Sequence, residues 1–560
     1  MSSKDCSTTE EKTISPNRKK LQTNLVMAAI LMNAFLAALD MLIITVALPT
    51  IVKDLDAPNS GYAWIGSSFI VAVSAAGPIW GKTSDIFGRK PMLLSANIVF
   101  MVGSLICALA QNLGMLLAGR AIQGVGAGGL SVLTNVIISD MFSLRERGFY
   151  LSLIGLTWAF ATAIGPLIGG GFAQNVSWRW CFWINLPCDG LAFALLFFFL
   201  KVHNPRTPIL AGLKAIDWLG SLTITAATVL FLLGVQFGGI VFPWDSATVI
   251  CLIIFGLLTY GLFFVVQWRL SPFPLLPPRI FAHRSTAAVL GVAFSHGIAY
   301  ISGAYYIPLY FQTVLAATPI LGGVWFLPSA GTLTVSILLS GIYQKKTGRY
   351  LELIFASFFL MTLGNGLYTD LKPYRSWSRI VIYQIIAGAG IGPLFQAPLV
   401  AIQTKLAPTD IAAGLSAYTS MRNVASAISV VCGQVILQSR LTKHYTQFID
   451  AGIPMGLAKA LSSGDAITAI SQTNALPGAQ RGLVAGVTND AFRYIWVFNC
   501  AISFVALLVC FLITKSKLSS DHVQHQTGLA GMRAAQTVVS GGKLTPRSAP
   551  RMEESHGEQA

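Results

Sequence analysis

The sequence predicts an all-α integral membrane protein with fourteen transmembrane helices in two related halves. Hydrophobic residues make up 54% of its 560 positions and charged residues only 11%, whereas soluble domains carry about 25% charged residues. Apolar stretches long enough to cross a bilayer alternate with short polar loops. One glycine-containing charged turn occurs twice, at residues 81–90 and 341–349. A duplicated turn between apolar stretches is typical of transporters built from two repeats.

The apolar stretches are placed by length, because about 20 helical residues cross a hydrocarbon core of about 30 Å. The qualifying stretches are residues 25–47, 62–81, 91–111, 113–138, 148–173, 180–200, 216–237, 247–268, 288–312, 319–343, 351–370, 380–404, 411–437 and 494–514. The polar head (1–23) and tail (516–560) are expected to be disordered and cytoplasmic. The stretch 439–493 is expected to be a long outer loop. Its run Leu457–Leu461 fits either a short surface helix or a solvated connector.

The distribution of Lys and Arg predicts that both termini are cytoplasmic. An even number of spans places the head and the tail on one side, and 26 of the 38 Lys and Arg residues fall on that side. Ten fall on the other side, and Arg120 and Arg422 lie within spans. The plasma membrane is the expected location, with a vacuolar membrane as the alternative. The glycosylation sequon at Asn175 falls on the predicted outer side, close to the membrane.

Several functional classes are disfavoured by composition. The net charge of +16 is spread over short loops, which argues against a nucleic-acid partner. No cluster of His, Cys and carboxylate residues resembles a metal or nucleophilic site, so neither a metal nor an enzyme is expected. Residues 76–83 approach a nucleotide-binding loop, but Ala76 replaces its first glycine and an apolar helix precedes it.

The duplicated turn is predicted to act as a conformational latch. Its glycines permit a tight backbone turn, and Asp85 can accept hydrogen bonds from a facing helix N-terminus or pair with Arg89. The alternative is a plain cytoplasmic turn that carries positive charge. Lys345 replaces Asp85 in the second copy, so the latch would be asymmetric. The predicted latch residues are Gly81, Asp85, Gly88, Arg89, Gly341, Gly348 and Arg349.

Three ionisable residues, Asp40, Arg120 and Arg422, stand within otherwise apolar spans. Burying each at mid-membrane costs about 2.5–3.5 kcal/mol on insertion scales, so each is expected to face a cavity or a partner. Burial disfavours a charged carboxylate and a nearby arginine favours it. Asp40 is therefore the predicted proton carrier, with Arg120 as its modulator. A static buried ion pair is the alternative.

Further polar and small residues are predicted to contribute to the transport path. Gln123, His296, Gln396 and Arg422 are expected to line a cavity. Asp189 is either a further candidate for carrying a proton or a residue that is simply wetted from outside. In the fifth span, Gly165, Pro166, Gly169 and Gly170 belong to the sequence GPLIGG. Proline bends a helix and glycine permits close approach. This segment is either a pivot of the transport path or a plain kink.

Together these motifs resemble the fourteen-span drug:proton antiporter branch of the major facilitator superfamily over about residues 24–515. GKTSDIFGRK (81–90) is similar to the superfamily's loop between spans 2 and 3. Leu39-Asp40 with Ala47-Leu48-Pro49 resembles the first-span motif, and Arg120 with Gln123-Gly124 resembles the fourth-span motif linked to proton transfer. GPLIGG resembles the antiporter motif, which implies export. Residues 178–187 resemble the marker before span 6. Two residues beyond this stretch, most family members have a glycine where this chain has Asp189.

The resemblance implies two six-helix bundles at 24–202 and 271–515, joined by a linker (203–270) that contributes two extra spans. The long loop before span 14 and the Gln-rich span 12 most resemble fungal members that export toxins and other secondary metabolites. The predicted function is proton-coupled export of amphipathic small molecules by alternating access, in a monomer driven by the proton gradient without a cofactor. Proton-coupled uptake, as in siderophore importers, is the alternative that GPLIGG disfavours. A sensor or scaffold would need a folded soluble domain, and neither terminus has the apolar content expected of one.

Overall fold

The chain folds almost entirely into helices, as the sequence predicts. The computed structural model describes residues 16–56, 59–202, 205, 207–239, 242–462, 476–520 and 528. Thirteen helices in this part of the chain are long and apolar enough to cross a membrane. A further helix, α6 (Leu144–Asn175), has 32 residues and occupies the fifth predicted span. Each predicted span therefore coincides with a helix, which confirms the fold class.

The first half of the chain provides six spans and the linker provides two more. Span 1 consists of α1 (Pro16–Leu42) and α2 (Ile44–Asp54), followed by α3 (Asn59–Phe87), α4 (Arg89–Ala108), α5 (Leu113–Met141), α6, and the pair α7 (Trp180–Trp183) and α8 (Asn185–Phe199). The linker contains the short α9 (Ile209–Ala215) and the spans α10 (Trp218–Phe237) and α11 (Ala247–Arg269). Asn112 caps α5, because its side chain accepts a hydrogen bond from the Met115 amide.

The second half provides the remaining six spans. They are α13 (Arg284–Thr313), preceded by α12 (Arg279–Ala282); α14 (Pro319–Thr347); α15 (Leu351–Tyr368); α16 (Trp377–Ile391) with η1 (Gly392–Phe395) and α17 (Ala397–Gln403); η2 (Pro408–Asp410) with α18 (Ile411–Lys443); and α22 (Gly478–Val509) with η4 (Cys510–Leu512). Span 12 changes to a 3-10 turn at Pro393, because proline cannot donate the hydrogen bond that an α-helix requires.

Two predicted irregular segments are more helical than expected. α1 begins at Pro16, so residues 16–23 of the predicted disordered head are helical; a proline fits the first turn of a helix, where its missing donor has no cost. Residues 1–15 lie outside the described part, as do 521–527 and 529–560 of the tail. In the predicted outer loop 439–493, α18 and α22 extend beyond the expected spans, and α19 (Tyr445–Asp450) and α20 (Met455–Leu461) lie between them. The short-helix interpretation of Leu457–Leu461 is thus confirmed.

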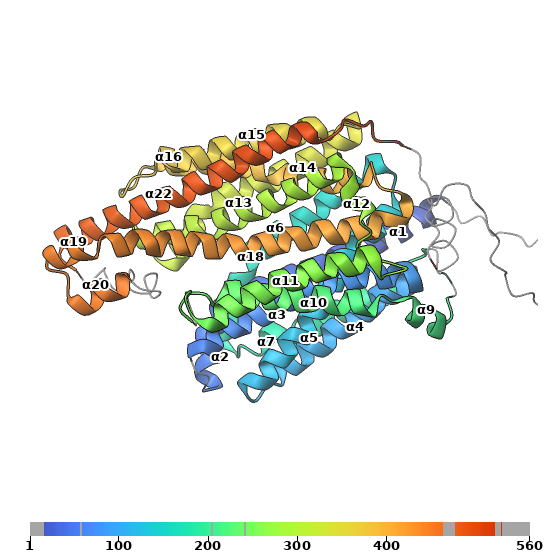
Figure 1. Ribbon diagram of the computed structural model, residues 1–560, viewed down its shortest axis with the longest axis horizontal. Helices are drawn as coiled ribbons and strands as arrows, with labels where there is room; N and C mark the ends of the chain where they lie inside the picture. The colour runs from blue at the N-terminus through green and yellow to red at the C-terminus, as the bar shows by residue number, and fades with distance from the viewer. Residues whose placement is uncertain are drawn as a thin grey trace, which may run out of the picture.

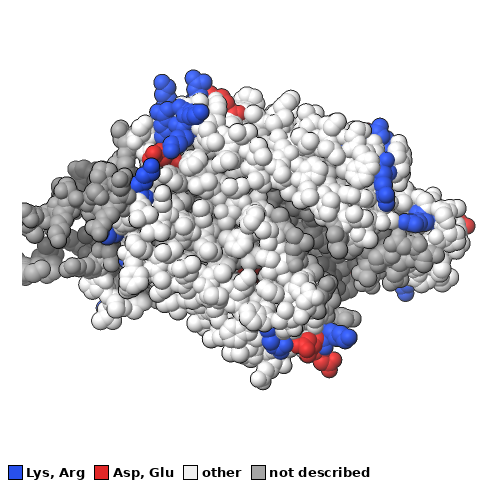
Figure 2. Space-filling model, turned by 180° about the vertical axis from the view of Figure 1, so that it is seen from behind, with Lys and Arg blue, Asp and Glu red and all other residues white. Residues whose placement is uncertain are grey.

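The helices form two lobes with the linker spans α10 and α11 beside them (Figure 1). α1 begins and η4 ends at one end of the molecule, called here the terminal face; α2, α19 and α20 lie at the opposite end, the loop face. Charged side chains gather toward these two ends and leave a broad uncharged belt between them (Figure 2). This distribution fits a bilayer around the middle of the molecule.

Candidate functional site

Asp40 lies at the centre of a buried polar network inside the first lobe. Its Oδ1 accepts a hydrogen bond from Asn185 Nδ2 at 3.0 Å, and its Oδ2 accepts one from Gln123 Nε2. The same two amides donate to Ser104 Oγ at 3.3 and 2.8 Å. These side chains come from α1, α8, α5 and α4, and all four residues are completely buried. Both carboxylate oxygens accept hydrogen bonds, which suits an ionised Asp40.

Arg120 supplies the positive charge near Asp40, and Gln123 lies between the two side chains. Its Nη1 lies 3.9 Å from Asp40 Oδ2, which is too long for a hydrogen bond. The same Nη1 donates to Gln123 Oε1 at 2.7 Å, so Gln123 bridges the two charges. Arg120 Nε also donates to the Ile65 carbonyl at 3.4 Å, and the guanidinium lies 4.2 Å from the Phe69 ring centre. The arginine therefore connects α5 to α3 as well as to α1.

The sequence paired Asp40 with Arg120 but assigned Gln123 to a cavity, and it gave no role to Ser104 or Asn185. A single neutral polar residue in a span is inexpensive enough to escape notice, unlike a charge. Asn185 does stand inside the distinctive aromatic stretch 178–187, which is the only sequence signal for it. The amides of Gln123 and Asn185 each donate to both Asp40 and Ser104, which closes the network.

Three of the four predicted cavity residues are instead packed inside a lobe. Gln123, His296 and Gln396 are completely buried. The Gln396 amide donates to Ser340 Oγ of α14, and the His296 ring packs against Phe395 with ring centres 5.0 Å apart. The amides of Gln123 and Gln396 find hydrogen-bond partners there, and the His296 ring has aromatic neighbours. Of these four residues, Arg422 is the one that lines a central cavity formed by described residues of both lobes.

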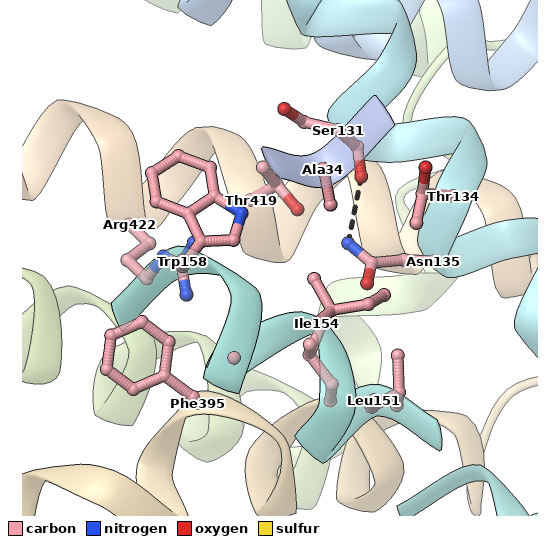
Figure 3. Close-up of a pocket in the computed structure, with 12 residues that line it drawn as sticks. Ala34, Ser131, Thr134, Asn135, Leu151, Ile154, Trp158, Phe395, Thr419 and Arg422 are labelled. Atoms are coloured by element: carbon pink, nitrogen blue, oxygen red, sulfur yellow. Dashed lines mark hydrogen bonds between the residues drawn. The ribbon is translucent and has the colours of Figure 1, made fainter. Parts of the chain in front are cut away.

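That central cavity has a volume of about 40 Å³. It is lined by α1, α5 and α6 of the first lobe and by η1, α17 and α18 of the second. Trp158, Phe395 and Arg422 meet on one side, and Asn135 and Thr134 lie on the other (Figure 3). Sites for drug-sized ligands are about 300–1,000 Å³. The cavity is therefore closed to such a molecule in this conformation.

Both copies of the duplicated turn bring a glycine against the opposite lobe. A Cβ at Gly81 of α3 would overlap Ser416 Oγ of α18, and one at Gly341 of α14 would overlap Ser152 Oγ of α6. The second glycine of each copy, Gly88 and Gly348, has a positive φ of 100° and 68°, which glycine adopts without strain. The copies thus share a backbone turn and a close interlobe contact.

The charged residues of the two copies differ, as the substitution at Lys345 led us to expect. Arg89 donates to Asp85 Oδ1 at 2.5 Å and to Asp140 Oδ2 at 2.8 Å, and it is 1% exposed. This arrangement joins the ends of α3, α4 and α5 within one lobe. In the second copy Arg349 lies 3.8 Å from Glu352, and both side chains are largely in solvent.

Further hydrogen bonds hold the lobes together at the terminal face. Arg145 of α6 donates to the carbonyls of Lys345 and Lys346 at 2.8 and 2.5 Å, where the last carbonyls of α14 lack helical partners. Arg147 donates to Gln403 Oε1 at 2.8 Å. Together with the two glycine contacts, these bonds close the terminal face.

The remaining predicted site residues fall on α6 and α8. A Cβ at Gly169 would overlap the carbonyl of Ile43, at the junction of α1 and α2. Gly165 and Gly170 lie on the same helix, whereas the side chain of Pro166 lies outside the described part. Asn175 is exposed at the end of α6. Asp189, whose wetting from outside was one of two expectations, is completely buried because α8 packs on α1 and α4.

The sequence was compared with known proteins. It matches the Major Facilitator Superfamily over residues 30–430. The chain belongs to the major facilitator superfamily. Efflux pump dotC of Dothistroma septosporum is 48% identical over 512 residues, which cover 91% of this chain and 88% of that protein. MFS-type transporter ppz2 of Metarhizium majus is 45% identical over 522 residues, covering 93% and 90%.

Solved structures agree on the fold. The major facilitator superfamily proton:xylose symporter XylE superimposes with a TM-score of 0.54, covering 89% of this chain and 97% of that chain, at 15% identity. At that identity the likeness shows the fold alone. Family and fold together make this chain a multi-pass membrane transporter and not an enzyme.

Proposed function

We propose that this transporter exports amphipathic organic molecules in exchange for protons by alternating access. The observation that carries the proposal is the completely buried Asp40 carboxylate, bridged to Arg120 through Gln123. We assign both termini to the cytoplasm, the plasma membrane as location with a vacuolar membrane as the alternative, and a monomer as the working unit. The terminal face is then the cytoplasmic face.

A proton on Asp40 would change the hydrogen bonds that its carboxylate now accepts. As a carboxylate it accepts hydrogen bonds from Gln123 and Asn185. When a proton binds at Oδ2, the Gln123 amide loses its acceptor there and Arg120 loses its counter-charge. Arg120 also donates to the Ile65 carbonyl of α3, so protonation weakens a link among α1, α3 and α5. A proton thus alters helix packing at one defined point.

α6 supplies the mechanical connection from this point to the substrate path. Its Gly169 contacts the α1–α2 junction at Ile43, three residues after Asp40. Its Trp158 lines the central cavity. Its Ser152 packs against Gly341 of α14 at the terminal face. A shift of one helix can therefore couple the proton site, the cavity and the closure between the lobes.

A sequence motif and the name of a relative support export as the direction of transport. GPLIGG resembles the antiporter motif, and Gly169 of that motif makes the close contact with Ile43. The relative dotC is named an efflux pump. The closed terminal face and the small central cavity fit a state from which substrate entry from the cytoplasm is blocked.

The proposal is tested in inside-out membrane vesicles that contain the overproduced protein. Three pyrene probes are offered outside: pyrenebutyrate, its uncharged amide and pyrenebutylamine. An acidic vesicle lumen should drive accumulation of at least one probe beyond the passive trapping in vesicles without the protein, and nigericin, which collapses the pH difference, should abolish this excess. Accumulation that survives nigericin, or net movement only in the opposite direction, would contradict proton-coupled export.

A further inference from the structure

One arginine side chain, that of Arg422, lines the central cavity. Arg422 is the single charged side chain among the described residues that line the cavity, and no lining residue there is a carboxylate. It stands on α18 within the span. An isolated charge inside a membrane protein is costly unless a partner or a ligand compensates it.

Aromatic side chains lie beside the Arg422 guanidinium, and none of its described neighbours is a carboxylate. The guanidinium lies 5.4 Å from the Phe395 ring centre, and the Trp158 indole lies on its other side (Figure 3). Among the described residues, no carboxylate oxygen lies within 4.0 Å of the Arg422 guanidinium. Arg89 and Arg120, in contrast, each have a carboxylate oxygen within that distance. The other titratable groups near enough to interact electrostatically with Arg422 are His296, Tyr300 and Tyr418, and none of them is a carboxylate.

We propose that Arg422 binds the oxyanion of the transported molecule, and that the preferred substrates are aromatic organic anions such as carboxylates. The planar guanidinium presents paired donors that match a carboxylate. Trp158 and Phe395 offer flat apolar surfaces to an attached ring system. This inference rests on the proposed export function and specifies its substrate class.

The position of this subsite also fits a carrier. Trp158 and Asn135 come from the first lobe, whereas Phe395 and Arg422 come from the second. A bound anion would therefore contact both lobes at once. The cavity of about 40 Å³ must widen to admit it, and separation of the lobes at this level provides that space. The substrate would leave when the lobes separate toward the other face.

Equilibrium binding to purified protein tests the inference without a pH gradient. We expect pyrenebutyrate to bind at least about tenfold more tightly than its amide or pyrenebutylamine, because one charge-assisted contact is worth that factor. Arg422→Gln should remove the preference by weakening pyrenebutyrate alone, while Arg422→Lys should retain part of it. Arg440→Gln is the matched control, since Arg440 lies on α18 over the Tyr494 ring, 3.3 Å from its centre, and away from the cavity.

Three results would overturn the inference: equal binding of the three probes by the unmodified protein, preference for the amine, or equal weakening of all probes by Arg422→Gln. The comparison of probes on the unmodified protein is sufficient even where a variant fails to fold. Failure of proton coupling in vesicles would leave this binding preference intact, so the two proposals fail separately.

Discussion

Arg120 and Arg422 are two arginines within spans, one in each half, and their surroundings differ. Arg120 is 1% exposed and has a carboxylate, an amide and a backbone carbonyl around it. Arg422 borders a cavity and has an aromatic ring but no carboxylate among the described residues. The first charge completes a protein network, whereas the second remains available to a ligand. The comparison separates the proposed proton site from the proposed substrate site.

The largest expected difference is in stability. Arg120→Leu leaves Asp40 buried without its counter-charge, and we expect a loss of about 3–5 kcal/mol. Arg422→Leu removes a charge that has no protein partner, so we expect less than about 1 kcal/mol. Thermal unfolding in detergent measures both, and Asp40→Asn combined with Arg120→Leu should recover most of the first loss. Equal losses of stability in Arg120→Leu and Arg422→Leu would contradict the view that only Arg120 is paired within the protein.

The same contrast is expected between the two copies of the duplicated turn. Arg89→Ala leaves the buried Asp85 and the partly buried Asp140 side by side without a cation, and we expect a loss of about 3 kcal/mol. Arg349→Ala should cost less than about 0.5 kcal/mol, because its side chain is 56% exposed and solvent screens the pair. Chemical unfolding of the two variants provides the measurement. A cost for Arg349→Ala that matches Arg89→Ala would refute the asymmetry.

The interlobe glycines should affect transport more than folding. Gly81→Leu places a side chain where Ser416 now lies, so the terminal face cannot close as observed. We expect vesicle transport to fall about tenfold or more with normal protein levels. Gly261→Leu is the control, since nothing lies within 4 Å of a Cβ there. Unchanged transport in Gly81→Leu would show that this contact is dispensable.

The smallest effect concerns an exposed ion pair at the loop face. Hydrogen bonds from Trp178 and Arg179 lower the pKa of Asp54. Because the folded-state pKa is depressed, this pairing stabilises fully above the unfolded value of about 3.9 and is lost as pH falls through the folded value. Screening limits it to about 0.2–1 kcal/mol. The stability gap between the unmodified protein and Asp54→Asn should close on acidification, and a gap that widens would contradict this.

Much of the fold was readable from the sequence, because the length of an apolar span obeys a simple rule in a membrane. The proximity of Asp40 and Arg120 was also readable, since opposite charges within apolar spans need each other. The direction in which Gln123, His296 and Gln396 point was not. In a helix that is apolar all round, lipid-facing and core-facing sides look alike, so only the packed structure distinguishes a cavity-lining residue from a buried one.

The most direct test of the account separates coupling from substrate recognition in proteoliposomes. Asp40→Asn should lose accumulation of pyrenebutyrate driven by a pH difference, yet retain exchange of labelled for unlabelled probe, because Arg422 remains in the cavity. Asp245→Asn, the same change at an exposed loop residue, should behave like the unmodified protein. Accumulation by Asp40→Asn at the unmodified rate would remove Asp40 from the mechanism and contradict the separation of the two sites.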